Sequence, residues 1–157
     1  MSVERRPERF RDPLVGLYSL AEQDIDVVCP RCSARAVISA QPHDGLTVLS
    51  WPRRLVCPTC THSAWWESKG NYSSWGGPID PFFRLPLWLR ASCRNGRTLW
   101  AFNEAHLTLL EDFVTARLRE RTPDGYHQTL VERLPAWLKS AKNRDEVRRV
   151  ISRMRAA

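Results

Sequence analysis

The chain has 157 residues, of which 43% are hydrophobic and seven are tryptophan, and its formal net charge is +7. This length suits one domain or two small ones, and the hydrophobic content is sufficient for a folded core. No apolar stretch approaches the length of a membrane span. The excess positive charge favours anionic partners, nucleic acid above all, although many proteins with such a charge have no nucleic-acid role.

Residues 1–23 are expected to form an irregular N-terminal arm. Basic and acidic residues alternate there, and Pro7 and Pro13 argue against a long helix. No apolar stretch at the start resembles a signal peptide, so we expect a reducing, cytoplasmic environment. Paired cysteines in that environment bind metal or act in redox chemistry, and seldom form disulfides.

Residues 24–67 contain two Cys-Pro-x-Cys pairs, Cys29–Cys32 and Cys57–Cys60. Each pair can form a tight turn whose two sulfurs point at one metal ion, and the 24 residues between the pairs are enough for an antiparallel strand pair that brings the turns together. Short β-prone runs bounded by Gly and Pro predict three or four small strands. We therefore expect a zinc ribbon in which Cys29, Cys32, Cys57 and Cys60 bind one structural zinc.

Iron–sulfur or redox chemistry remains the alternative use of these thiolates. A redox Cys-x-x-Cys usually occurs once, inside a βαβ pattern, whereas this motif occurs twice in strand-like sequence. A catalytic zinc keeps an open coordination position and generally has His or carboxylate ligands, so four cysteines favour a closed, structural site.

Residues 68–86 are rich in Gly, Ser, Pro and aromatic residues and are predicted to be a linker. Tyr72 and Trp75 have two possible uses. Exposed on a flexible loop, they would stack on nucleic-acid bases. Packed against the ribbon, they would belong to a strap, and we favour this second interpretation because exposed Trp is uncommon without a use.

Residues 87–102 predict a β-hairpin around a two-residue Asn95-Gly96 turn. This turn sets Cys93 opposite Thr98 and Leu89 opposite Phe102. Opposite residues share a face, so the register predicts one apolar face. Its members would be Leu87, Leu89, Ala91, Cys93, Trp100 and Phe102. We therefore expect Cys93 to be buried beside Trp100 and away from the metal.

Three helices are expected after the hairpin, and residues 87–157 are assigned to one hairpin-and-helix region. The first begins at the N-cap Asn103 and has apolar residues at helical spacing as far as Leu118. The second runs from about Gln128 and is kinked or split by Pro135. In the last, Asn143 and Glu146 resemble a capping pair. Its apolar residues are Val147, Val150, Ile151 and Met154.

The C-terminal region carries most of the excess positive charge. Like charges at helical spacing slightly destabilise an isolated helix, which makes an anionic partner more plausible. The candidate phosphate-contacting residues are Lys139, Lys142, Arg148, Arg149, Arg153 and Arg155. The alternative is that they form an ordinary solvated face.

No set of residues typical of catalysis is found. The sequence has no Gly-rich phosphate loop, no Gly-x-Ser-x-Gly and no His-Glu-x-x-His motif. His62 lies near Cys60, but four thiolates already saturate a zinc ion. His106 falls at the third position of a predicted helix, where capping or packing is expected. We therefore predict a protein that is not an enzyme.

In its order of motifs the chain resembles a group of small bacterial proteins described as containing a transcription-factor-IIB-type zinc ribbon. The residues that carry the resemblance are the two cysteine pairs, Leu85–Leu89, Thr98–Asn103 with His106 and Leu107, and Leu134–Val147, so that it covers roughly residues 29–155. The resemblance implies bound zinc and a cytosolic location, and it suggests nucleic acid by analogy.

The sequence as a whole predicts an α+β fold, with a small antiparallel zinc ribbon, a β-hairpin and about three C-terminal helices. Two functions remain open. In the first, the basic C-terminal helix binds nucleic acid through phosphate contacts. In the second, the protein is an adaptor or accessory subunit that docks on a larger complex, and its positive charge serves solubility or steering. Neither function involves a membrane or a small-molecule substrate.

Overall fold

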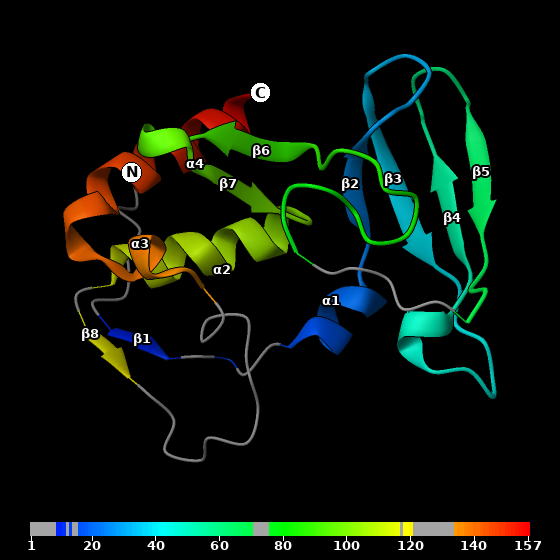
Figure 1. Ribbon diagram of the computed structural model, residues 1–157, viewed down its shortest axis with the longest axis horizontal. Coiled ribbons are helices and arrows are strands. Elements are labelled where there is room, and N and C mark those ends of the chain that lie inside the picture. The colour runs from blue at the N-terminus through cyan, green and yellow to red at the C-terminus, as the bar shows by residue number, and fades with distance from the viewer. Residues whose placement is uncertain (1–8, 12, 14–15, 71–75, 117, 121–133) are drawn as a thin grey trace, which may run out of the picture.

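The structure is a computed structural model that describes residues 9–11, 13, 16–70, 76–116, 118–120 and 134–157. The fold is mixed α and β, as expected, with a four-stranded antiparallel sheet, a β-hairpin and C-terminal helices. Figure 1 shows the four-stranded sheet on one side of the molecule and the hairpin with its helices on the other. Among the described residues, no helix has both the length and the apolar character that a membrane crossing requires.

The four-stranded sheet consists of β2 (Ile25–Val28), β3 (Arg35–Ala40), β4 (Arg53–Val56) and β5 (Ser63–Trp66), paired in that order. Side chains alternate between the two faces, and apolar residues on one face are buried. This inner face includes Ile25, Val27, Ala36, Ile38 and Leu55. A short 3-10 helix, η1 (Val48–Ser50), lies in the connection between β3 and β4.

The free edge of β2 is covered by the chain around the hairpin. The backbone N–H of Val28 donates to the carbonyl of Pro86 at 2.9 Å, and that of Asp26 donates to the carbonyl of Phe102 at 2.8 Å. These bonds attach the hairpin to the sheet, so that β2 is paired on both sides.

Residues 76–86, which the sequence assigns to a linker, pack against the sheet. Phe82 is buried, and its ring lies 4.9 Å from that of Trp66 in an edge-on contact. The fully buried carboxylate of Asp80 accepts backbone N–H groups from Phe82, Phe83 and Leu85, and these bonds fix the turn. Tyr72 and Trp75 lie outside the described residues.

The hairpin is formed by β6 (Leu89–Ser92) and β7 (Thr98–Ala101), and its predicted register is wrong by one residue. Leu89 pairs with Ala101 rather than Phe102, because the turn contains three residues, η2 (Arg94–Gly96). Asn95 and Gly96 both adopt the left-handed conformation, with φ of 62° and 68°. Left-handed residues occur in three-residue hairpin turns as well as in two-residue turns, so the Asn-Gly pair alone does not determine the length of the turn.

The shift exchanges the two faces of β7. The buried residues form two cores, one among the hairpin and the C-terminal helices (the helical core) and one under the four-stranded sheet. Leu99 and Ala101 face the helical core, whereas Phe102 and the half-buried Trp100 join the core under the sheet. Cys93 is half-buried against the helical core, so the expectation that it lies beside Trp100 is also wrong. The hairpin thus contributes one face to each of the two cores.

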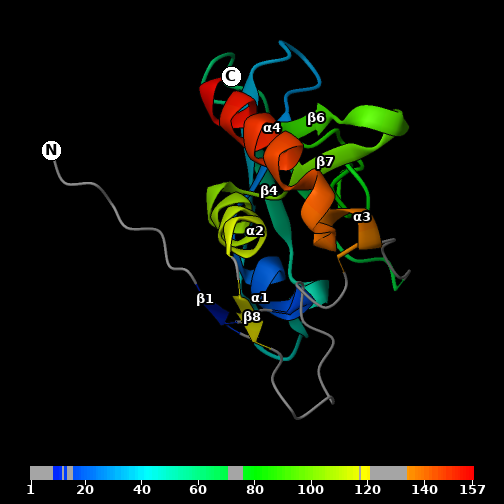
Figure 2. The same cartoon turned by 90° about the vertical axis from the view of Figure 1, so that its left-hand side faces the viewer.

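The helical core lies between the hairpin and two helices, α2 (Glu104–Thr115) and α4 (Arg144–Ala156). In Figure 2, α4 runs obliquely above α2, which is seen nearly end-on. The predicted N-cap is confirmed: the side chain of Asn103 accepts the backbone N–H of His106. Helix α2 ends at Thr115, earlier than predicted. The residues after it include β8 (Leu118–Glu120), which pairs in parallel with β1 (Arg9–Arg11).

A short helix, α3 (Ala136–Lys139), begins directly after Pro135, and residues 128–133 of the predicted second helix lie outside the described residues. Asn143 is the N-cap residue of α4, but the expected capping pair does not form. Its side-chain amide donates to the carbonyl of Trp137, and Glu146 accepts the backbone N–H of Arg94 instead.

The predicted N-terminal arm contains regular structure. Besides β1, it includes α1 (Leu17–Glu22). Leu20 of this helix is part of the core under the four-stranded sheet, and the neighbouring Ala21 is also buried. Phe10 on β1 is buried in the helical core, where its ring makes an edge-on contact with Phe113. Each of the two cores therefore receives a side chain from this segment.

Candidate metal centre and basic helix

The two Cys-Pro-x-Cys turns have the same backbone geometry. In the first, Ser33 N–H donates to the carbonyl of Cys29 at 3.0 Å, and in the second, Thr61 N–H donates to the carbonyl of Cys57 at 2.9 Å. The residue after each pair is left-handed, with φ of 63° at Ser33 and 64° at Thr61. The first turn connects β2 to β3 and the second connects β4 to β5, so antiparallel pairing places both at the same end of the sheet.

This placement brings the four sulfurs together, as the sequence predicts. The Sγ atoms of Cys29 and Cys60 lie 3.7 Å apart, those of Cys32 and Cys57 lie 3.6 Å apart, and all four lie within 4.8 Å of one another. The separations are too long for disulfides, whose S–S length is about 2.0 Å. Four sulfurs bound to one ion at about 2.3 Å in a tetrahedron would be about 3.8 Å apart. The cluster could therefore bind one metal ion.

The backbone around Cys29 and Cys57 favours the deprotonated thiolate that a metal requires, whereas the neighbouring sulfurs contribute to a raised pKa at Cys32. Backbone N–H groups of Cys60 and Thr59 donate to the sulfur of Cys57, and these bonds lower the pKa of its thiol although burial opposes them. The backbone N–H of Arg31 lies 3.4 Å from Cys29 Sγ. Tight turns of this kind supply amide donors to the sulfurs without any polar side chain.

Cys93 and His62 do not belong to the cluster. Among the described residues, the group that could hold a metal consists of Cys29, Cys32, Cys57 and Cys60. Burial raises the pKa of the Cys93 thiol, which disfavours the thiolate form. His62 contributes only its carbonyl to the second turn, as the acceptor of the Cys57 N–H.

Helix α4 buries one side and exposes basic residues on the other. Val147, Val150, Ile151 and Met154 are buried in the helical core, whereas Arg148, Arg149 and Arg153 are exposed. In the part of the chain that the structure describes, none of these three arginines forms an ion pair. Arg149 and Arg153 stand one helical turn apart, where like charges repel slightly.

The fourth candidate on this helix, Arg155, is already paired. Its guanidinium donates to Glu104 at 2.5 Å and to Glu111 at 2.6 Å, and it also donates to the hydroxyl of Thr108 at 2.9 Å. All three partners lie on α2. Arg155 therefore connects the two helices.

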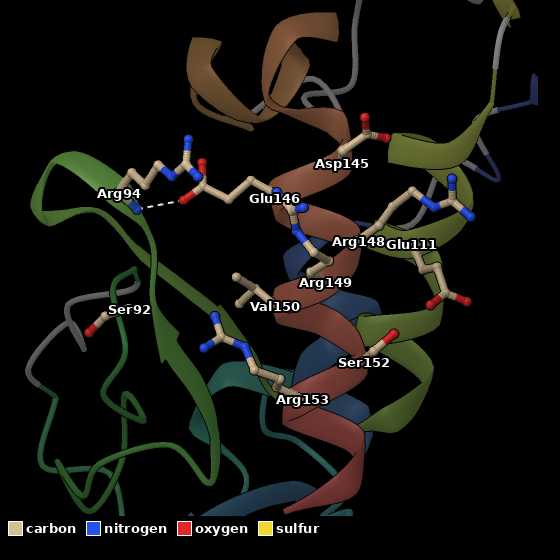
Figure 3. A pocket seen from close by; sticks show the side chains of 10 residues that line it. All are labelled: Ser92, Arg94, Glu111, Asp145, Glu146, Arg148, Arg149, Val150, Ser152 and Arg153. Atoms are coloured by element: carbon tan, nitrogen blue, oxygen red, sulfur yellow. Dashed lines mark hydrogen bonds between the residues drawn. The ribbon is translucent and has the colours of Figure 1, made fainter.

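The exposed arginines surround an open hollow of about 890 Å³ between α4, α2 and the hairpin (Figure 3). Arg94 reaches the hollow from the hairpin turn, where its backbone N–H donates to Glu146 of α4. The sequence alone did not indicate that Arg94 lies beside α4, because the two residues are 52 positions apart. Three carboxylates also line the hollow. They are Glu111, Asp145 and Glu146. Glu111 is bound by Arg155 and Glu146 by the Arg94 backbone, whereas Asp145 is exposed and has no ion pair among the described residues. The four guanidinium groups of Arg94, Arg148, Arg149 and Arg153 still outnumber the three carboxylates.

The two candidate lysines, Lys139 and Lys142, precede α4 in the chain and do not line this hollow. Lys139 ends α3, and Lys142 lies in a short 3-10 helix, η3 (Ala141–Asn143); both are exposed. The described structure thus brings Arg148, Arg149 and Arg153 together with Arg94, and leaves Lys139 and Lys142 on the approach to α4.

Comparisons of the chain with protein-family models, with curated proteins and with solved structures found no match.

Proposed function

We propose that this protein is a non-enzymatic zinc-ribbon protein that binds nucleic acid through the exposed arginines of α4. Cys29, Cys32, Cys57 and Cys60 would hold one structural zinc, since four thiolates close the coordination sphere. The ion would tie β2–β3 to β4–β5 at one end of a sheet too small to be stable through its apolar contacts alone. A cytoplasmic location agrees with thiolates that are kept reduced.

The proposal for nucleic acid depends mainly on one observation: Arg148, Arg149 and Arg153 are exposed and without ion pairs among the described residues, while the apolar side of their helix is buried. Guanidinium groups suit phosphate oxygens and, in this arrangement, would contact the backbone of a nucleic acid and not its base edges. Arg94 adds a fourth guanidinium from the hairpin turn. Lys139 and Lys142 would extend the positive surface, whereas Arg155 is committed to α2.

The test is a fluorescence-anisotropy titration of a labelled DNA duplex with the wild type and with Arg148→Glu/Arg149→Glu/Arg153→Glu. We expect the wild type to bind within the non-specific range, with Kd between about 10⁻⁶ and 10⁻⁴ M at physiological salt, and the triple variant to lose this binding. The control is Lys69→Glu/Arg90→Glu, which reverses two charges at exposed positions away from the hollow and from the cysteine turns, and it is matched to the double variant Arg149→Glu/Arg153→Glu. It should lower affinity much less than that double variant does.

The same titration distinguishes nucleic-acid binding from the alternative function as an adaptor. Binding that the triple change leaves intact, or no wild-type binding tighter than about 10⁻⁴ M, would mean that the basic side of α4 is a solvated face. The adaptor function would then take precedence. A pull-down from native lysate with and without nuclease would distinguish the two, because nuclease removes only partners that are held through nucleic acid.

A further inference from the structure

The outer face of the four-stranded sheet is open and carries an exposed tryptophan. Arg54 on β4 pairs with Trp65 on β5 and with Ser39 on β3, and the neighbouring row consists of Val37, Val56 and Ser63. These six residues define the outer face. On β3 and β4 each of them is next to a buried inner residue, and on β5 Ser63 and Trp65 alternate with the half-buried Ala64 and Trp66.

Trp65 has 61% of its surface exposed, and Arg54 places its guanidinium carbon 5.6 Å from the centroid of the ring. The next residue, Trp66, faces inward and packs on Phe82, so sheet formation fully explains that tryptophan. It does not explain Trp65, whose ring is exposed although the Arg54 guanidinium lies over it. An exposed ring of this size on a flat strand surface suggests a ligand.

One cation on this face, Arg54, is available to an anion. Asp26, on the neighbouring β2, is only 5% exposed, and Arg35 binds its carboxylate at 2.5 Å. Glu67 follows Trp65 by two residues, just beyond the end of β5, and is exposed. Its carboxylate is the acidic group nearest to Trp65 along the chain and offsets part of the charge of Arg54, so the binding of a nucleic acid would depend on the exposed ring together with one available guanidinium. No ion pair joins Arg54 to a carboxylate of the described residues, so its guanidinium remains available to a phosphate.

We propose that the outer face binds single-stranded nucleic acid, with a base stacked on Trp65 and a neighbouring phosphate bound by Arg54. An aromatic ring on an open sheet provides a stacking platform for any base, and an adjacent cation holds the backbone. A duplex cannot use this platform, because its bases are already stacked inside the helix. This inference rests on the proposed function for the class of partner, nucleic acid. It uses a different surface, because the outer face of the sheet does not include α4.

The probe is a labelled single-stranded thymidine oligonucleotide, and the variants are Trp65→Ala, Trp65→Phe and Arg54→Gln. Trp65→Ala should weaken single-strand binding by about 5- to 150-fold and leave duplex binding unchanged. Trp65→Phe keeps a ring and should lose less. Leu46→Ala is the matched control, because Leu46 is 45% exposed but lies in the loop between β3 and β4. It should bind as the wild type does.

A second measurement separates stacking from a loss of folding. Bound oligonucleotide should quench tryptophan emission in the wild type, and Trp65→Phe, which keeps an aromatic ring at this exposed position, should lose most of that quenching while it still binds. Arg54→Gln should flatten the dependence of log affinity on log salt by about 0.7, the value for one single-strand phosphate contact.

The outcomes separate this inference from the proposed role of α4. If Trp65→Ala binds the single strand as tightly as the wild type, the inference is overturned, and duplex binding that depends on the α4 arginines would still stand. If Trp65→Ala loses single-strand binding while the triple arginine variant keeps duplex binding, the inference stands and the α4 site falls. A wild type that binds neither probe overturns both.

Discussion

The backbone N–H of Phe102 donates a hydrogen bond to Nδ1 of His106 at 3.1 Å. In return, the backbone N–H of His106 donates to the side-chain oxygen of Asn103, the N-cap residue of α2, at 2.8 Å. His106 thus helps to close the start of the helix in the manner of a capping box. Its ring can accept this bond only when Nδ1 is unprotonated, and burial lowers the pKa of His106 to about 4.

The first prediction is a loss of stability in mild acid that depends on His106. Its unfolded pKa is about 6.5 and its folded pKa is lower, so between these values the unfolded state binds more protons. The stability from neutral His106 is therefore complete above about pH 6.5 and is lost as the pH falls towards 4. We expect about 2 kcal/mol of this loss by pH 4.5.

His106→Asn is the comparison, because its side-chain oxygen can accept the Phe102 N–H but does not titrate. Urea unfolding of both proteins between pH 7 and pH 4.5 measures the difference. The buried carboxyls of Asp26 and Asp80 have raised pKa values and act in the opposite direction in both proteins, so they cancel in the difference. Parallel stability curves for the two proteins would contradict the prediction.

The second prediction concerns Arg53, whose side chain is almost completely buried. Its guanidinium donates to the carbonyls of Ala21 and Val48 and stacks 4.1 Å from the centroid of the Phe82 ring. Arg53→Met keeps the apolar stem but leaves the carbonyl of Ala21 without this partner and removes the contact with Phe82. The carbonyl of Val48, in contrast, keeps the N–H of Trp51. We therefore expect the free energy of unfolding to fall by about 2 kcal/mol.

Arg54→Met is the matched control, because the adjacent Arg54 is exposed and contacts only the ring of Trp65. It should cost no more than about 1 kcal/mol in urea unfolding. Equal losses from the two substitutions would show that the Arg53 contacts do not hold α1 and η1 to the sheet.

The third prediction uses the left-handed conformation of Thr61, at φ 64°. A β-branched residue is strained there, and Gly is not. Thr61→Gly should raise the stability of the zinc-loaded protein by about 0.5 to 1 kcal/mol. Thr59→Gly, in the same turn but outside the left-handed region, should lower it. A loss of stability for both variants in thermal unfolding would contradict this account of the turn.

Local sequence signals predicted the cysteine cluster, the start of α2 and the buried side of α4. Each depends on spacing within a few residues, such as the two Cys-Pro-x-Cys turns or Asn103 before Glu104. The hairpin shows the limit of such signals. Asn95-Gly96 fits turns of two or three residues equally well. One extra turn residue places Trp100 and Phe102 on the opposite face from Leu89, where they join the core under the four-stranded sheet.

Long-range contacts could not be predicted from the sequence. Nothing local to Phe10 indicates that it packs on Phe113, and nothing local to Arg155 indicates its ion pairs with α2. The expected capping pair at the start of α4 failed for the same reason. Glu146 has a distant competitor, the Arg94 backbone, for its carboxylate.

The fourth prediction is that the purified protein contains one zinc per chain and loses it in Cys57→Ser. The sulfur of Cys57 lies 3.6 Å from that of Cys32, and removal of one of four ligands opens the site. Cys93→Ser is the control, because Cys93 is outside the cluster and should keep the full metal content. Less than about half an equivalent of zinc, measured by plasma mass spectrometry, would contradict the prediction, as would iron in its place.

The most direct test of the proposed function is the salt dependence of duplex binding. If Arg148, Arg149 and Arg153 each contact one phosphate, the negative slope of log affinity against log salt should have a magnitude of at least about 2.7, and more if Arg94, Lys139 or Lys142 also contact phosphates. Arg149→Gln should reduce that magnitude by about 0.9. Arg155→Gln, which removes a guanidinium that is bound to α2, should leave the slope unchanged. A wild-type slope near zero, or a slope that does not respond to Arg149→Gln, would contradict nucleic-acid binding through this helix.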